Sequence, residues 1–180
     1  YLVNNSLQPC VDFAIWGPFR TRIVKRLKFT GRVLNEHGIL ESREVLGPPT
    51  ILQWNACHRV MKTGFLMADI LDLGGLDEHY DKINDYYSQY GEEAWLLIYQ
   101  ADTRFRQERM EQIGFEIDLE CEKADPPIEL TYQQKWRKAW GRGLKDNEWW
   151  AKQLVDPARA LLLKIAQSKN VIAGDVRTAG

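Results

Sequence analysis

The spacing of apolar positions along the chain predicts a short β-hairpin followed by helices. Between residues 21 and 33, apolar side chains take the odd positions Ile23, Leu27, Phe29 and Val33, and basic side chains take most even ones. This alternation is typical of a strand. Residues 35–38 supply turn chemistry, and residues 39–46 can return as the second strand, which Gly47-Pro48-Pro49 ends.

After the prolines, apolar residues recur every three or four positions, the period of amphipathic helices. We expect the third of these helices to weaken at Gly114 and the acidic residues 116–125, and Pro126-Pro127 to stop it. Asp146 or Asn147 can cap a short helix, and Asp156-Pro157 can open the last one. The predicted helices are 50–71, 76–90, 92–113, 130–140, a short one carrying Trp149 and Trp150, and 157–168, with interruptions at Gly141 and Gly143 and a frayed tail over 173–180.

These elements predict a mainly α fold in four parts. An N-terminal β-hairpin is followed by a helical bundle and a Trp-rich helical C-terminal arm. The boundaries are an extended arm at 1–18, a basic β-hairpin at 19–48, a helical core at 49–125 and a basic Trp-rich helical extension at 126–180.

The chain has 180 residues, 44% of them hydrophobic, which suffices for a real core. It lacks both a membrane-span-length apolar stretch and a signal-peptide pattern, so we expect a soluble protein. Cys10, Cys57 and Cys121 fit neither a disulfide framework nor a zinc motif. This cysteine usage favours a reducing intracellular compartment: cytoplasm or nucleus, or an organelle if a targeting segment has been removed.

Charge is segregated although the net charge is only −1. Residues 1–35 carry six basic side chains and one acidic, residues 36–130 eight basic and twenty acidic, and residues 131–180 ten basic and four acidic. Two basic ends around an acidic middle indicate either a polyanion held by the ends, or ends that pair with the middle of the same or a neighbouring molecule. Both readings predict a binding function.

Two basic groups are candidate nucleic-acid-binding sites. The hairpin group could track a phosphate backbone, although charge on an edge strand also prevents aggregation. The second group interleaves cations with two tryptophans, which could stack on bases but more readily dock the segment on the bundle. The candidate residues are Arg20, Arg22, Arg26, Lys28 and Arg32 in the first group, and Lys135, Trp136, Arg137, Lys138 and Trp140 in the second.

Asp69, Asp72 and Asp77 support an alternative function, a divalent-metal-dependent phosphoester hydrolase. Acidic residues that recur along a helix in this way usually form its solvent-exposed face. Cys57 and His58 are neighbours that point about 100° apart on a helix, so they do not form a dyad. The chain also lacks phosphate-loop, dinucleotide and Gly-x-Ser-x-Gly motifs. We therefore expect no catalytic residues, bound metal or cofactor.

Several motifs resemble uncharacterised reading frames associated with mobile elements in algal genomes. The motifs are residues 13–18 (FAIWGP), Gly47-Pro48-Pro49, Trp54 and residues 95–104 (WLLIYQADTR). The layout of a hairpin before a helical bundle also resembles the capsid domains of retroelement Gag proteins, although the chain lacks a Gag-type zinc knuckle. These features together favour a non-enzymatic structural or assembly protein that contacts other subunits or itself, with RNA or DNA as a further candidate partner. An accessory subunit of a large complex is another alternative.

Overall fold

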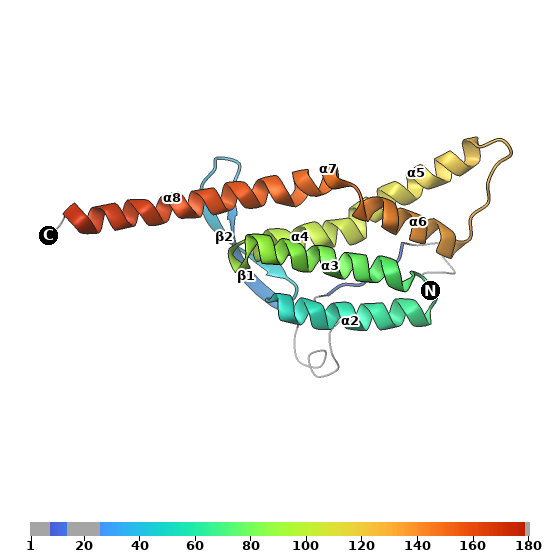
Figure 1. Ribbon diagram of the computed structural model, residues 1–180, viewed down its shortest axis with the longest axis horizontal. Helices are drawn as coiled ribbons and strands as arrows, with labels where there is room; N and C mark the ends of the chain where they lie inside the picture. Colours follow the sequence, from blue (N-terminus) through green and yellow to red (C-terminus); the bar gives the residue numbers. More distant parts are fainter. Residues whose placement is uncertain (1–7, 14–25, 179–180) are drawn as a thin grey trace.

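The computed structural model describes residues 8–13 and 26–178, with side chains described up to residue 170. It confirms a mainly α fold with an N-terminal hairpin (Figure 1). The elements are β1 (Lys28–Leu34), β2 (Leu40–Leu46), α2 (Ile51–Met67), α3 (Leu73–Tyr90), α4 (Trp95–Arg104), α5 (Met110–Lys123), α6 (Tyr132–Leu144), α7 (Asn147–Trp150) and α8 (Asp156–Thr178).

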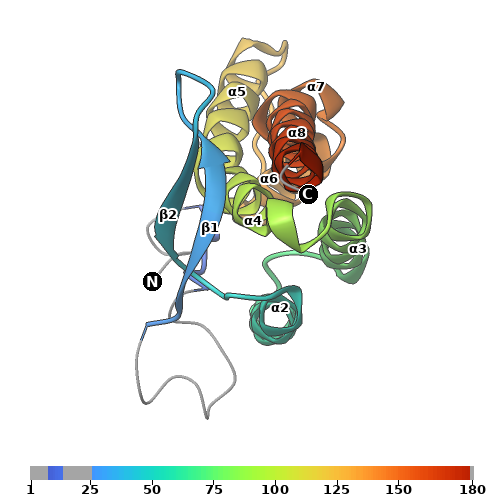
Figure 2. The ribbon, with the colours of Figure 1, turned by 90° about the vertical axis from the view of Figure 1, so that its left-hand side faces the viewer.

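The antiparallel hairpin pairs Lys28 with Leu46 and Leu34 with Leu40. The side chain of Asn35 closes its turn by accepting hydrogen bonds from the backbone N–H groups of His37 and Ile39 at 2.9 and 3.0 Å. Figure 2 shows the hairpin along one side of the helices. Gly31 permits this approach, because a Cβ there would lie 2.5 Å from the Leu96 side chain on α4. The predicted hairpin is confirmed, and its residues before 26 lie outside the described part.

Side-chain caps fix the first helices. Thr50 accepts a hydrogen bond from the backbone of Gln53 at 3.3 Å, and Asp72 accepts one from Gly75 at 2.7 Å. The expectation that the first helix reaches residue 71 was wrong: α2 ends at Met67, and Asp69 then adopts a left-handed turn with φ 52°. Leu71 is nevertheless buried, as predicted from its place in the repeating apolar positions.

The expected weakening at Gly114 and residues 116–125 was also wrong. From Trp95 the chain stays helical to Lys123, through a π-helical segment at Phe105–Arg109. Gly114 lies where the Trp136 ring of α6 packs, since a Cβ there would be 2.8 Å from that ring. Acidic side chains of α5 pair with cations of α6, for example Glu120 with Arg142 at 2.8 Å, which stabilises the helix.

The C-terminal segment shares the core of the preceding helices, which includes Trp136, Trp140, Trp150 and Leu154. Contrary to expectation, α6 continues through both of its glycines to Leu144, and α8 reaches Thr178. Asp146 caps α7 as predicted. A π-helical segment at Ala151–Val155 then leads without a break into α8. α8 begins at Asp156-Pro157 as predicted, although the chain is already helical before it.

The distal half of α8 extends beyond the other elements (Figure 1). Its first half packs near β1 and α3. In the described part of the chain, no helix combines the length and apolar character needed to cross a membrane.

Two glycines of α6 give a matched test of the packing. A Cβ at Gly143 would meet Phe105 at 2.7 Å, whereas one at Gly141 would have no neighbour within 4 Å. We expect Gly143→Ala to lower the free energy of unfolding by about 1–3 kcal/mol through overpacking. Gly141→Ala should raise it by up to about 1 kcal/mol through helix propensity. Urea denaturation measures both, and equal effects would contradict the packing of α6 on Phe105.

Candidate functional site

A fully buried charged network lies where three helices meet. Asp102 of α4 and Arg106 are one helical turn apart, His79 lies on α3 and Trp54 on α2, and each is at most 1% exposed. The Asp102 carboxylate accepts hydrogen bonds from Trp54 Nε1 at 2.8 Å and from Arg106 Nε and a terminal nitrogen at 3.1 and 2.9 Å. His79 Nε2 lies 2.7 Å from its other oxygen. The network ties α2, α3 and α4 together.

Arg106 also holds the N-terminal segment 8–13. Its guanidinium donates a hydrogen bond to the carbonyl oxygen of Val11 at 2.5 Å and lies over the Phe13 ring at 4.0 Å. Phe13 is fully buried, and its ring packs edge-on against Trp54 at 5.8 Å between centroids. A single arginine therefore links the helical core to a segment some 95 residues earlier.

The charges in this network favour a structural role. Burial opposes ionisation of Asp102, but the Arg106 charge and the hydrogen bonds from His79 and Arg106 hold its pKa well below the usual range. Burial lowers the pKa of His79, so the ring is neutral and donates its Nε2–H to the carboxylate. With no solvent access, these groups cannot reach a substrate. The network was not predicted from the sequence, although Asp102 and Arg106 stand at i and i+4 on the otherwise apolar face of their helix, which indicates a buried ion pair.

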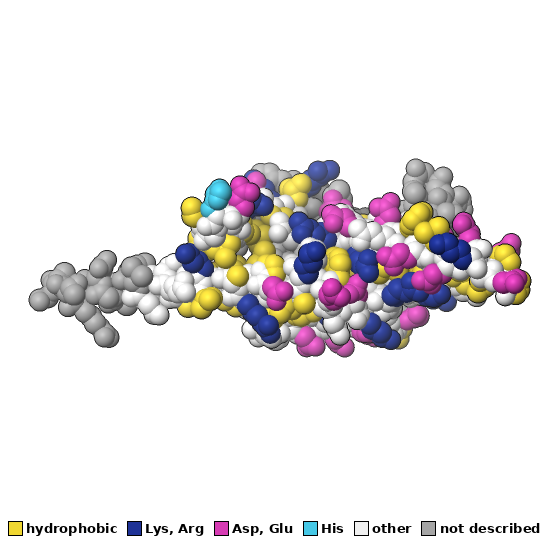
Figure 3. Space-filling model, turned by 90° about the horizontal axis from the view of Figure 1, so that it is seen from above, with side chains coloured by type: hydrophobic (Ala, Val, Ile, Leu, Met, Phe, Trp, Pro, Cys, Tyr) yellow, Lys and Arg dark blue, Asp and Glu magenta, His cyan; other side chains and the backbone are white. Residues whose placement is uncertain are grey.

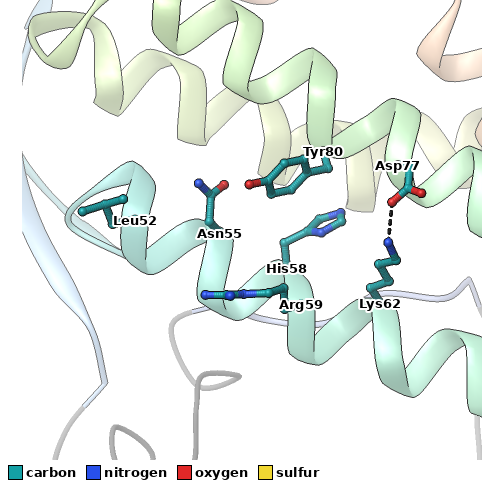
Figure 4. Close-up of a pocket in the computed structure, with 7 residues that line it drawn as sticks. All are labelled: Leu52, Asn55, His58, Arg59, Lys62, Asp77 and Tyr80. Carbon is teal, nitrogen blue, oxygen red and sulfur yellow. Dashed lines mark hydrogen bonds and ion pairs between the residues drawn. The ribbon is translucent and has the colours of Figure 1, made fainter.

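An open pocket of about 350 Å³ lies between α2 and α3 (Figure 4). The buried ring of His58 and the ring of Tyr80 face it from the two helices. Burial, followed by the effect of His79, lowers the pKa of His58 to about 3, and its Nε2 has no hydrogen-bond partner within the described structure. The other lining residues are Leu52, Asn55, Arg59, Lys62 and Asp77.

The hairpin cations predicted to bind nucleic acid are partly engaged. Arg20 and Arg22 lie outside the described residues. Lys28 pairs with Glu44 across the hairpin at 3.0 Å, and Arg32 lies 3.9 Å from Glu93. Arg26 is exposed and has no ion pair with another described residue.

The second predicted group is docked on the bundle. Trp136 and Trp140 are 3% and 1% exposed, so in this arrangement their rings are not free to stack on bases. The three cations near them are paired with carboxylates of α5 and of the α2–α3 turn. The pairs are Lys135 with Asp118 at 2.6 Å, Arg137 with Asp69 at 2.5 Å, and Lys138 with Glu120 at 3.7 Å.

Asp69, Asp72 and Asp77, the candidate metal ligands of the hydrolase alternative, each interact with a different partner. Asp69 pairs with Arg137, Asp72 caps α3, and Asp77 pairs with Lys62. Over the described residues, no three His, Cys, Asp or Glu side chains are grouped to hold a metal ion. The sequence placed these carboxylates close along the chain, but the fold directs them to separate partners.

Among the charged side chains that are not paired internally, two groups lie on α8 and on α3. Arg159, Lys164 and Lys169 on α8 are exposed and form no ion pair with the rest of the described chain. On α3, the exposed Glu78, Asp81 and Asp85 recur at helical spacing and lie on one face. On the face seen in Figure 3, acidic and basic side chains mix over the α5–α6 end, whereas hydrophobic ones gather near the hairpin and α8.

The buried histidines make stability depend on pH. The folded-state pKa of His58 is about 3 against 6.5 in the unfolded chain, so below pH 6.5 the unfolded state binds more protons and stability falls. We expect wild type to lose about 2 kcal/mol more of its unfolding free energy between pH 7 and 5 than His58→Phe, which keeps a flat ring. Urea denaturation at both pH values measures this. An equal loss in both proteins would contradict a neutral, buried His58, and the exposed His37→Phe serves as the control.

Comparisons with protein-family models, with curated proteins and with solved structures found no match to this chain. The resemblances to algal mobile-element reading frames and to the Gag capsid layout therefore stay predictions.

Proposed function

We propose that this chain is a non-enzymatic assembly protein that binds further copies of itself through oppositely charged helices. The observation that carries the proposal is a pair of exposed, oppositely charged surfaces: the cations on α8, and the acidic row Glu78, Asp81 and Asp85 on α3, which outnumbers the single cation of that helix, Lys82. In contrast, the cations of α6 are paired within the chain and leave little charge for a partner.

The placement of the two surfaces supports a head-to-tail contact. Arg159 and Lys164 are exposed on the first half of α8 and Lys169 on the half that extends beyond the bundle, while the acidic row lies on α3 (Figure 1). A contact between two different surfaces is heterologous, so each copy keeps one surface of each kind free for the next copy. Such contacts build rings or filaments, consistent with a structural role.

Nucleic acid is the second candidate partner, favoured by the hairpin. Arg26 is exposed, and the sequence has no acidic residue between Asp12 and Glu36. A polyanion bound there would leave the α8–α3 contact available, as expected for a protein that assembles on RNA or DNA.

We further propose a reducing intracellular compartment, cytoplasm or nucleus. Cys10, Cys57 and Cys121 are all free thiols, and Cys57 is buried. Free cysteines are more typical of reducing compartments than of secreted proteins.

Self-association should depend on salt and on α8. At about 50 mM salt we expect wild type to sediment as species larger than a monomer, and to dissociate at about 500 mM as screening shortens the range of the attraction. Arg159→Glu/Lys164→Glu should remain monomeric at both. The control Lys123→Glu/Lys145→Glu makes the same change in net charge at exposed positions on α5 and after α6, and should assemble like wild type. A wild-type monomer at low salt, or identical behaviour of the two variants, would overturn the proposal.

Nucleic-acid binding by the hairpin should show in retention on single-stranded RNA. We expect binding at about 50 mM salt that weakens by at least about tenfold at 200 mM, because each neutralised phosphate releases a counterion. Arg26→Glu/Arg32→Glu should abolish retention, and Lys123→Glu/Lys145→Glu should preserve it. Absence of retention at the lower salt would leave self-association as the function.

A further inference from the structure

We propose that the pocket between α2 and α3 binds a small molecule carrying an oxyanion, a carboxylate or a phosphate, on a flat apolar ring. This ligand site is separate from the charged surfaces proposed for assembly. It is built from side chains of two helices that the buried network holds together.

The side chains that line the pocket carry a net positive charge, which favours a negatively charged ligand. Lys62 and Asp77 pair with each other across the pocket (Figure 4), and His58 is neutral, which leaves Arg59 as the unmatched charge. The Arg59 side chain forms no ion pair or hydrogen bond with any other described side chain, and it is exposed at the α2 edge. A guanidinium presents parallel N–H groups that match the two oxygens of a carboxylate or phosphate.

The walls of the pocket suit a ring. The rings of His58 and Tyr80 lie 5.3 Å apart between centroids at 53°, and Leu52 presents an apolar side chain that is 75% exposed. An exposed leucine beside aromatic walls offers apolar area that a flat ligand can cover. The volume of about 350 Å³ lies at the small end of ligand sites, which fits one substituted ring.

The polar groups of the pocket are preorganised and incompletely satisfied. Asn55 and Asn84 exchange hydrogen bonds at 3.2 and 3.1 Å, which fixes the Asn55 amide at the edge of the pocket. The Nε2 atom of His58 has no partner within the described structure, although the side chain is only 1% exposed. An unpaired buried polar atom costs stability, and such atoms persist where a ligand or water completes the bonding.

Isothermal titration of the full chain with phenyl phosphate, benzoate, inorganic phosphate and neutral benzamide tests the proposal. We expect one or both ring-bearing anions to bind. Inorganic phosphate lacks the ring and benzamide lacks the negative charge, so each should bind at least about tenfold more weakly. Tighter binding of phenyl phosphate assigns a phosphate, and tighter binding of benzoate assigns a carboxylate.

Variants locate the binding. Arg59→Gln should weaken the ring-bearing anions by about tenfold or more, the effect of one charge-assisted hydrogen bond. The control Lys123→Gln removes an exposed cation at the end of α5 and should leave binding unchanged. Both substitutions are at exposed positions and should not impair folding. Unchanged binding in Arg59→Gln, equal affinity for phenyl phosphate and inorganic phosphate, or no binding of either ring-bearing anion would overturn the proposal.

Discussion

The ion pair between Asp102 and Arg106 is the contact on which the remaining structure depends. Removing two charges from water is costly, and the cost is offset only if hydrogen bonds satisfy both groups. Here Trp54 and His79 form hydrogen bonds with the carboxylate. The guanidinium donates a hydrogen bond to the Val11 carbonyl oxygen and makes a cation–π contact with the Phe13 ring. These partners come from α2, α3 and the N-terminal segment, so the pair is satisfied when these elements pack around it. The network thus selects the packing that also forms the pocket between α2 and α3.

The features predictable from sequence are those set by near neighbours along the chain. Thr50, Asp72 and Asp146 cap helices within three residues of their own positions, and the hairpin turn is closed by the Asn35 side chain. Helix ends were predicted less well, because partners far along the chain decide them. The acidic end of α5 stays helical because cations of α6 neutralise it.

The candidate sites also depend on contacts between residues far apart along the chain, which local sequence patterns do not predict. The Trp54–Asp102 bond spans 48 residues and the His79–Asp102 contact 23, so local patterns could not bring these groups together. Pairing of the basic ends with the acidic middle was one of the two alternatives that the charge blocks indicated. The fold uses much of that pairing within one molecule, between α5 and α6, which leaves α8 and α3 as the charged surfaces open to partners. The pocket was not predicted from the sequence: Asp77 was considered only as a metal ligand and His58 only as a partner of Cys57, and nothing local indicates that α2 and α3 bring the two side chains to one pocket.

The central claim is that α8 of one molecule contacts α3 of the next. Mixing two charge-reversed proteins in sedimentation velocity tests it most directly: Arg159→Glu/Lys164→Glu, which makes α8 acidic, and Asp81→Lys/Asp85→Lys, which makes α3 basic. Each alone carries like charges on both surfaces and should be monomeric at low salt, whereas their mixture restores opposite charges at every contact and should assemble. A mixture that stays monomeric, while wild type assembles under the same conditions, would contradict the account.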